Sequence, residues 1–149
     1  MVDLLIEAAC CAPSAGNMQP WEFIVVRDEE VKERLAKAAG DQSFISEAPV
    51  VCVVCAVPGR SGSRYGDRGR ELYCLQDTAA AVQNLMLTAS ANGLGSCWVG
   101  AFDEDKVSEI LAIPGEARPI ALIPVGYPRE SPAPRRRRPL EEVVHREKW

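Results

Sequence analysis

The segment from Glu71 to Asn92 is the feature that most constrains what this chain can fold into. It is rich in alanine and favours one long helix, which the Asn92-Gly93 pair ends. Apolar residues cover most of the predicted helix surface, as in a helix that is buried in a core or in a subunit interface. The fold must therefore surround this helix with other elements or with a second subunit.

Four apolar segments predict strands, at residues 21–27, 49–57, 95–102 and 119–127. The second of them is a continuous run rich in β-branched residues, which is typical of a buried strand. Shorter helices are expected at residues 2–11, 28–39 and 103–112. Asp28 and Asp103 are the expected N-caps of the last two, and the Gly/Arg/Ser-rich segment 58–70 predicts a mobile loop. Four strands and about four helices in mixed order predict an α+β layer architecture.

The size and charge of the chain limit its classes of function. A chain of 149 residues with 47% hydrophobic residues is expected to form one domain over residues 1–149. Its net charge of −4 argues against binding to nucleic acid or to an anionic membrane. No apolar run approaches the roughly 20 residues of a membrane span and no secretory signal is visible, so a cytoplasmic location is expected. The Pro-rich residues 128–139 cannot pack as a core element, and residues 128–149 are expected to form an extended arm.

Six cysteines lie in apolar helix or strand patterns rather than in loops: Cys10, Cys11, Cys52, Cys55, Cys74 and Cys97. This distribution predicts small core residues in a reducing compartment rather than disulfides. Cys52 and Cys55 form a C-x-x-C within a predicted strand, where positions three apart point to opposite faces. A thioredoxin-type redox pair is therefore not favoured.

Turn-forming and amide residues gather between the first helix and the first strand, in the sequence Ala-Pro-Ser-Ala-Gly-Asn-Met-Gln-Pro-Trp at residues 12–21. Pro13 ends the helix, and Gly16 permits backbone angles or close approaches that other residues do not. Hydrogen-bonding side chains lie beside them, at Ser14, Asn17 and Gln19. The segment suits a ligand cradle, although an ordinary helix-to-strand loop has a similar composition.

Three ordered segments resemble the nitroreductase family, the FMN-dependent NAD(P)H oxidoreductases. Residues 12–21 resemble the loop after the first core helix of that family, and residues 73–102 are similar to its central helix and flavin-facing strand. The run Arg-Arg-Pro-Leu-Glu-Glu-Val-Val-His at residues 137–145 and the Glu-Lys-Trp terminus are similar to its C-terminal segment. The resemblance implies an α+β fold with a mainly antiparallel sheet flanked by helices. It also implies a homodimer in which the subunits exchange their C-terminal arms.

The resemblance further implies FMN as the cofactor and NADH or NADPH as the electron donor. The residues that would contact the isoalloxazine and ribityl groups from one subunit are Pro13, Ser14, Ala15 and Asn17. Gly100 and Ala101 would present main-chain N–H groups to N5 and O4 of the ring from the other subunit. A glycine at a strand end is the alternative interpretation of Gly100.

Arginines in the C-terminal arm match positions where the family binds the FMN phosphate. Arg135 and Arg137 are the expected ligands, with Arg138 as a substitute because the register of the run is ambiguous. A solvated basic tail is the alternative interpretation. Family members usually begin with an Arg-Arg-Ser-type segment that also binds FMN, and this sequence starts after it. Either the start codon lies too far downstream, or arginines of the arm and of residues 58–70 compensate for a contact whose loss weakens binding about tenfold or more.

The implied reaction needs no protein acid or base, because flavin N5 accepts a hydride from the nicotinamide and the reduced flavin then serves a second substrate in a ping-pong cycle. The single histidine, His145, lies in the tail, and no metal-ligand cluster is visible, so neither a catalytic residue nor a metal is expected. The expected activity is the reduction of nitroaromatic, quinone or similar small acceptors. The alternatives are a non-catalytic or weakly flavin-binding dimer, and an enzyme for reductive dehalogenation or flavin fragmentation.

Overall fold

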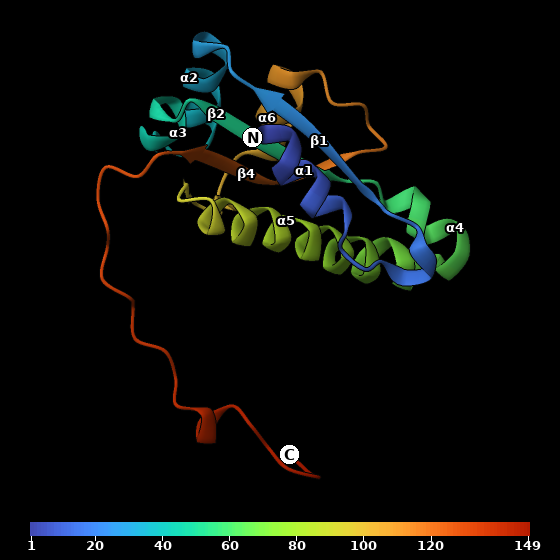
Figure 1. Cartoon of the computed structure of the whole chain (residues 1–149). Helices are drawn as coiled ribbons and strands as arrows, with labels where there is room; N and C mark the ends of the chain where they lie inside the picture. The colour runs from blue at the N-terminus through green and yellow to red at the C-terminus, as the bar shows by residue number, and fades with distance from the viewer.

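A four-stranded antiparallel sheet forms the centre of the protein (Figure 1). The structure is a computed structural model that describes residues 1–149. Neighbouring strands pair in the order β1-β2-β4-β3, and every pair is antiparallel, as expected. The strands are β1 (Trp21–Val26), β2 (Val50–Ala56), β3 (Gly95–Ser96) and β4 (Arg118–Gly126).

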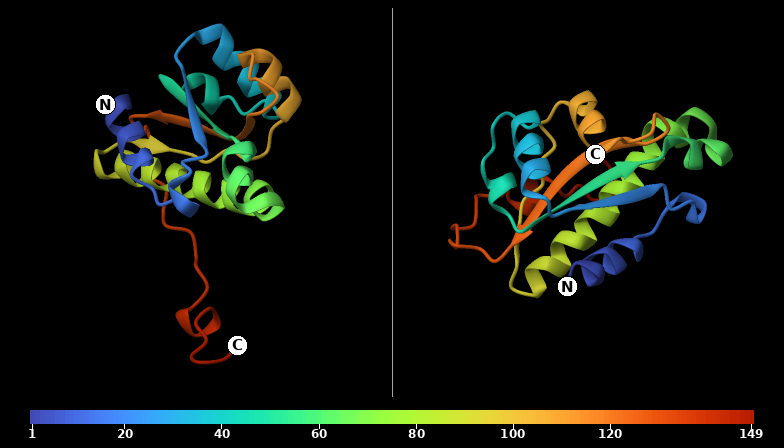
Figure 2. Two further views of the ribbon diagram at one scale, coloured as in Figure 1. Left: turned by 90° about the vertical axis from the view of Figure 1, so that its right-hand side faces the viewer. Right: turned by 90° about the horizontal axis from the view of Figure 1, so that it is seen from above.

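Helices cover both faces of the sheet and make a three-layer arrangement (Figure 2). On one face lie α1 (Val2–Cys10) and α5 (Cys74–Ala91). On the other face lie α2 (Glu29–Ala38), α3 (Phe44–Glu47) and α6 (Glu104–Leu111). The predicted α+β layer architecture is therefore confirmed, and α3 is an element that the sequence patterns did not predict.

Four further helical segments lie outside these layers. The helix α4 (Pro58–Arg68) is followed by the π-helical turn η2 (Gly69–Tyr73), which leads into α5. Short 3₁₀ turns form η1 (Ala15–Asn17) before β1 and η3 (Leu140–Glu142) in the C-terminal arm. Figure 1 shows α4 at one end of the molecule, next to the start of α5.

The predicted N-caps are confirmed by hydrogen bonds. Asp28 Oδ1 accepts from the main-chain N–H of Val31 at 2.9 Å, and Asp103 Oδ1 accepts from that of Lys106 at 3.1 Å. Each bond satisfies an N–H group that the first turn of a helix leaves without a partner. These two caps fix where α2 and α6 begin.

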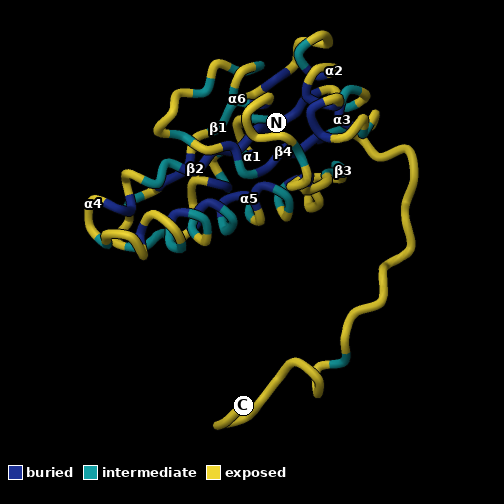
Figure 3. The backbone as a smooth tube through the Cα atoms, turned by 180° about the vertical axis from the view of Figure 1, so that it is seen from behind, coloured by how far each residue is buried: buried dark blue, intermediate teal, exposed yellow.

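The central strand β2 separates two apolar cores. All of its residues are buried, as its sequence predicts (Figure 3). Because side chains alternate along a strand, Cys52 and Val54 pack toward α1 and α5, whereas Val53 and Cys55 pack toward α2 and α6. The prediction that Cys52 and Cys55 point to opposite faces is confirmed, and both thiols are free.

The long helix α5 buries one face against the sheet. Its fully buried residues include Ala81, Leu85 and Ala89, which recur at the spacing of one helix face. Leu87, on another face, is 59% exposed. The helix begins at Cys74 rather than at Glu71, because residues 69–73 form the π-helical turn. The sheet thus covers only one side of this apolar helix.

Residues 58–70 are helical, and their prediction as a mobile loop is wrong. Pro58 begins α4, where its fixed φ angle suits the first helical turn. Gly66 has a φ of 57° and kinks the helix. Gly69 lets η2 pack closely on α4, because a Cβ atom there would lie 2.4 Å from the Ser61 carbonyl oxygen. The glycines that suggested a loop instead permit a kink and a close helical contact.

Residues 95–102 form much less of the sheet than predicted. The strand β3 contains only two residues, and Val99 adds a single bridge to Leu122 of β4. The chain leaves the ladder between these two contacts. Cys97 lies in this break and is exposed, as are Cys10 and Cys11 at the end of α1, so the prediction of six core cysteines is wrong for these three.

The C-terminal arm runs away from the three layers as an extended chain (Figure 1). Nearly all of its residues are exposed. Its large apolar side chains are also exposed, at Leu140, Val143, Val144 and Trp149, as is Tyr127 just before the arm. No helix in the structure combines the length and the apolar character that crossing a membrane requires.

Candidate functional site

The loop at residues 13–19 joins α1 to β1 and has an unusual backbone. Gly16, Asn17 and Gln19 have positive φ values of 58°, 57° and 47°. Such angles are costly for residues other than glycine, so the surrounding contacts must hold the loop in this form. Within the loop, the Ser14 Oγ atom accepts a hydrogen bond from the Gln19 N–H at 3.0 Å.

Helix α5 holds one side of this loop. The main-chain N–H of Ala15 donates to Asp77 Oδ2 at 3.1 Å. Burial raises the pKa of the Asp77 carboxyl, and the hydrogen bond from Ala15 opposes that effect. A partly buried carboxylate therefore depends on the loop for its hydrogen bond, and the loop depends on the carboxylate for its position.

Helix α4 holds the other side of the loop. Arg60 Nη1 donates to the Gln19 carbonyl oxygen at 3.0 Å, and Arg60 also forms an ion pair with Glu22 of β1. The Tyr65 hydroxyl lies beside Gly16, because a Cβ atom at Gly16 would be 2.6 Å from Tyr65 Oη. The loop 13–19 therefore contacts α5 on one side and α4 on the other.

Three of these contact residues were not among the predicted site residues. Asp77 had a signal in the sequence, because a carboxylate four residues before the buried Ala81 lies near the buried face of the predicted helix. Arg60 and Tyr65 lie in the segment that was interpreted as a mobile loop, so no pattern in the sequence indicated that they contact the loop 13–19. Pro13 and Asn17, which were predicted, are exposed, while Ser14 and Ala15 are half-buried.

Gly100 and Ala101 follow the bridge between Val99 and Leu122. Both are exposed, and neither main-chain N–H has a hydrogen-bond acceptor within the chain. The nearest atom to a Cβ at Gly100 would be Trp98 Nε1 at 3.6 Å, so the space beside this backbone is open. Exposed, unpaired donors beside an open space fit the predicted role at the edge of a planar, electron-rich ring.

One chain does not bring these two parts of the predicted site together. The loop 13–19 precedes β1 at one edge of the sheet, whereas Val99 pairs with β4 at the other edge. Three strand spacings separate these edges, which corresponds to about 14 Å. One chain therefore holds the two parts of the predicted site at opposite edges of the sheet.

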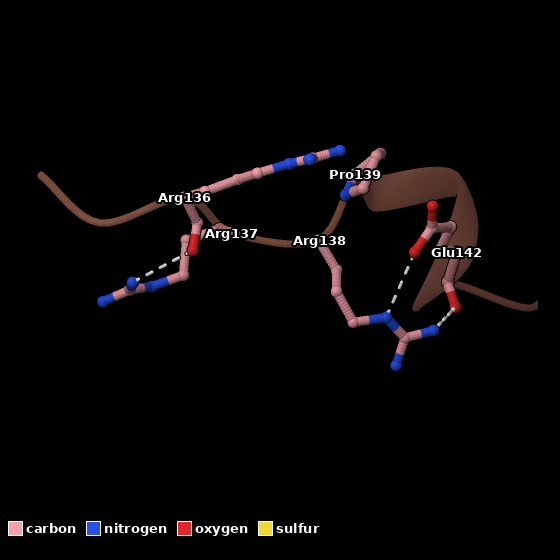
Figure 4. A pocket seen from close by; sticks show the side chains of 5 residues that line it. All are labelled: Arg136, Arg137, Arg138, Pro139 and Glu142. Carbon is pink, nitrogen blue, oxygen red and sulfur yellow. Dashed lines mark hydrogen bonds and ion pairs between the residues drawn. The ribbon is translucent and has the colours of Figure 1, made fainter.

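The predicted phosphate ligands lie in the arm, away from both parts. A hollow of about 230 Å³ is lined by Arg136, Arg137, Arg138, Pro139 and Glu142 (Figure 4). Arg138 is engaged, because its Nε atom lies 3.2 Å from Glu142 Oε2 and its Nη2 donates to the Glu142 carbonyl oxygen. Arg137 donates only to main-chain carbonyls, so its charge has no carboxylate partner. The geometry therefore favours Arg137 over Arg138 as the arginine that is free to bind an anion.

Comparison with known proteins finds relatives along nearly the whole chain. An NADH dehydrogenase from Thermus thermophilus is 36% identical over 167 residues, which cover 94% of this chain and 82% of the relative. A nitroreductase family protein from Streptococcus pneumoniae superposes with a TM-score of 0.88 at 30% identity, covering 98% of this chain and 88% of that one.

An NADPH:FMN oxidoreductase from Vibrio harveyi, solved in complex with NAD⁺, superposes with a TM-score of 0.89 at 26% identity. The match covers 99% of this chain and 67% of the longer protein, and some other similar structures are longer still, with 65% covered. The sequence profile of the Nitroreductase family matches residues 1–44 and 37–127. The core elements and both main-chain parts of the candidate site lie within these matches, and the chain belongs to the Nitroreductase family.

Proposed function

We propose that this protein is an FMN-dependent NAD(P)H oxidoreductase that reduces nitroaromatic, quinone or similar small acceptors. Its family supports this function, as do the names of its relatives, an NADH dehydrogenase and an NADPH:FMN oxidoreductase. The observation that carries the proposal is the pair of unpaired N–H groups at Gly100 and Ala101 beside an open space. Such donors suit the electron-rich edge of a flavin ring.

The proposal includes a homodimer with two identical sites between its subunits. Each site takes the loop 13–19 from one subunit and Gly100 with Ala101 from the other, because one chain keeps them at opposite sheet edges. Leu4 and Leu87 are exposed on the helical layer of α1 and α5, and the arm exposes further apolar side chains. Exchange of the arms between subunits would bury these side chains.

Bound FMN supplies the hydride-accepting ring, and the protein binds and orients it. The residues proposed to line the isoalloxazine and ribityl groups are Pro13, Ser14, Ala15 and Asn17. Gly100 and Ala101 donate hydrogen bonds to the ring edge, and Arg135 and Arg137 bind the phosphate with charged hydrogen bonds. The transferred hydride passes through none of these side chains, so none is a catalytic residue.

The visible absorption spectrum of the purified full chain tests this function. The spectrum is recorded before and after addition of FMN, and then of NADPH or NADH, without oxygen. Flavin bands that bleach on addition of the nicotinamide are expected. A colourless protein that changes with neither reagent would contradict the proposal and favour a non-catalytic dimer.

The phosphate ligands are tested by changing Arg135 and Arg137 together to alanine. Loss of charged hydrogen bonds costs about 1.5–3 kcal/mol each, so the dissociation constant for FMN should rise at least about tenfold. Arg129→Ala is the matched control, because Arg129 is an exposed arginine of the same arm outside the predicted site. Equal FMN affinity in the wild type and the double variant would remove Arg135 and Arg137 from the site.

A cytoplasmic location is part of the same proposal. All six cysteines are free, and three of them are exposed, which suits a reducing compartment. Fractionation of the source cells checks this location. Recovery of the protein mainly from an extracytoplasmic fraction would contradict it.

A further inference from the structure

Two arginines and two tyrosines form a cluster on α4 and η2, here called the Arg-Tyr patch and defined as Arg64, Tyr65, Arg68 and Tyr73. The rings of Tyr65 and Tyr73 meet edge to face, with centroids 5.3 Å apart and an interplanar angle of 79°. The Arg64 guanidinium lies 5.6 Å from the Tyr65 centroid, and that of Arg68 lies 5.3 Å from the Tyr73 centroid. Arg68 Nε also donates to Tyr73 Oη at 2.9 Å. The four side chains thus support one another.

Both guanidinium groups of the Arg-Tyr patch are available to a ligand. Arg64 and Arg68 are exposed, and no carboxylate lies within ion-pair distance of either one, although Asp67 and Glu71 belong to the same segment. Arg60 of the same helix differs, because Glu22 already neutralises it. The patch therefore presents two positive charges that no group of the chain neutralises.

The Arg-Tyr patch borders the loop 13–19. A Cβ atom at Gly16 would lie 2.6 Å from Tyr65 Oη and 3.0 Å from Arg64 Nη1. The backbone beneath the patch is fixed by the kink at Gly66 and by the contact of Gly69 with Ser61. A molecule that reaches the loop from this side must therefore pass along the patch.

We propose that the Arg-Tyr patch binds the adenosine phosphate part of the pyridine nucleotide donor. This inference rests on the proposed function, because it places the nicotinamide end at the flavin beside the loop 13–19. Planar guanidinium groups stack on nucleic acid bases, and their N–H groups bind phosphate oxygens with fixed geometry. A nucleotide offers both chemistries, and a small neutral quinone offers neither a base nor a phosphate.

The FMN phosphate is the other phosphate that these arginines could meet, and experiment separates the two sources. The test variant is the double change Arg64→Ala and Arg68→Ala. The matched control is Arg34→Ala, because Arg34 is an exposed arginine without an ion pair on α2, which lies in the layer on the other side of the sheet. The double variant should keep the FMN affinity of the wild type.

Direct binding is measured first, by calorimetry on the full chain with adenosine 2′,5′-bisphosphate as the probe. The wild type and Arg34→Ala should bind the probe, with an affinity that falls as salt is added. The double variant should bind it at least about tenfold more weakly, as expected for the loss of charged hydrogen bonds. Equal binding by all three proteins would overturn the proposal, as would a wild type that does not bind.

Kinetics with three donors then locate the effect. The double variant should lose at least about tenfold in kcat/KM for NADPH or NADH, and far less for reduced nicotinamide mononucleotide, which lacks the adenosine phosphate. An equal loss for all three donors, or a matching loss of FMN affinity, would overturn the proposal. Failure of the proposed function has a different result, because the wild type would then oxidise none of the three donors. The calorimetric measurement would still show whether the Arg-Tyr patch binds the probe.

Discussion

Asp77 in the long helix accepts a hydrogen bond at 3.1 Å from the main-chain N–H of Ala15, which lies 62 residues earlier in the chain. This bond connects the helix that builds the core to the loop that is proposed to hold the flavin. Rigid support of this kind is what a binding loop with three residues at positive φ requires. The affinity for FMN should therefore depend on a side chain that is not itself proposed to touch the cofactor.

Replacing Asp77 with alanine should weaken FMN binding, because the Ala15 N–H loses its acceptor and the loop loses its tie to α5. A neutral to charged hydrogen bond contributes about 0.5–3 kcal/mol, so a rise of a few-fold to about a hundredfold in the dissociation constant is expected. Asp77→Asn keeps an acceptor oxygen in the same place and should retain most of the affinity. Fluorescence titration with FMN compares the two variants, and equal losses in both would show that the bond to Ala15 does not position the loop.

The stability of Asp77→Asn should depend on pH in a defined direction. Burial raises the pKa of Asp77 in the folded protein, so this carboxyl favours folding when protonated and opposes it as the pH rises through the raised value. Asparagine removes that penalty and should make the variant at least as stable as the wild type at pH 7. The difference should disappear below pH 3.8, the ordinary pKa of an aspartate. Urea unfolding between pH 3 and pH 7 measures it, and a variant that is less stable only at neutral pH would contradict the prediction.

Two glycines of the α4 and η2 segment should respond oppositely to alanine. A Cβ at Gly69 would lie 2.4 Å from the Ser61 carbonyl oxygen, so Gly69→Ala should destabilise the fold by about 1–3 kcal/mol. Gly59 lies in α4 with no atom within 4 Å of its Cβ position, so Gly59→Ala should stabilise it by about 0.4–1 kcal/mol. Thermal unfolding of both variants checks the pair, and a neutral Gly69→Ala would show that η2 does not pack on α4 this tightly.

The sequence patterns predict the central part of this fold well, because burial there follows from periodicity. A continuous β-branched run is typical of a strand that is buried on both faces, and all residues of β2 are buried. The caps at Asp28 and Asp103 depend only on local chemistry, and both form as predicted. Local rules of this kind need no knowledge of the partners that an element meets.

The patterns fail where a contact distant in sequence decides the structure. Gly69 by itself suits a flexible loop, and only its close contact with Ser61 shows that it allows two helical segments to pack together. Residues 95–102 are apolar enough for a full strand, but only Val99 and the two residues of β3 reach β4. The candidate site shows the same division. The composition of residues 12–21 suggested a ligand cradle, whereas the hydrogen bond by which Asp77 supports the loop 13–19 is a contact between distant parts of the chain.

The six cysteines should fall into two classes of reactivity. Burial raises the pKa of Cys52 and of Cys55 to about 11, and Cys74 is also buried with a raised pKa. The three exposed thiols are Cys10, Cys11 and Cys97. A chromogenic disulfide reagent at pH 8 should therefore modify three thiols in the native protein at once, and the others only after unfolding. Rapid reaction of all six, or of none, would contradict this assignment.

Replacing Gly100 with valine should remove flavin binding without disturbing the fold. The Cβ position at Gly100 has ordinary contact distances, with Trp98 Nε1 nearest at 3.6 Å, so the chain itself tolerates a side chain there. A branched side chain would nevertheless occupy the space beside the unpaired N–H groups of Gly100 and Ala101, where the ring edge is proposed to lie.

Gly115→Val is the matched control for this change, since Gly115 also has open space at its Cβ position and lies outside the proposed site. Flavin absorbance and the rate of NAD(P)H oxidation are measured on both variants, with the melting temperature as the check on folding. Gly115→Val should behave as the wild type, whereas Gly100→Val should melt at a similar temperature and turn over no flavin. Undiminished turnover in Gly100→Val would show that the flavin ring does not meet the backbone at Gly100 and Ala101.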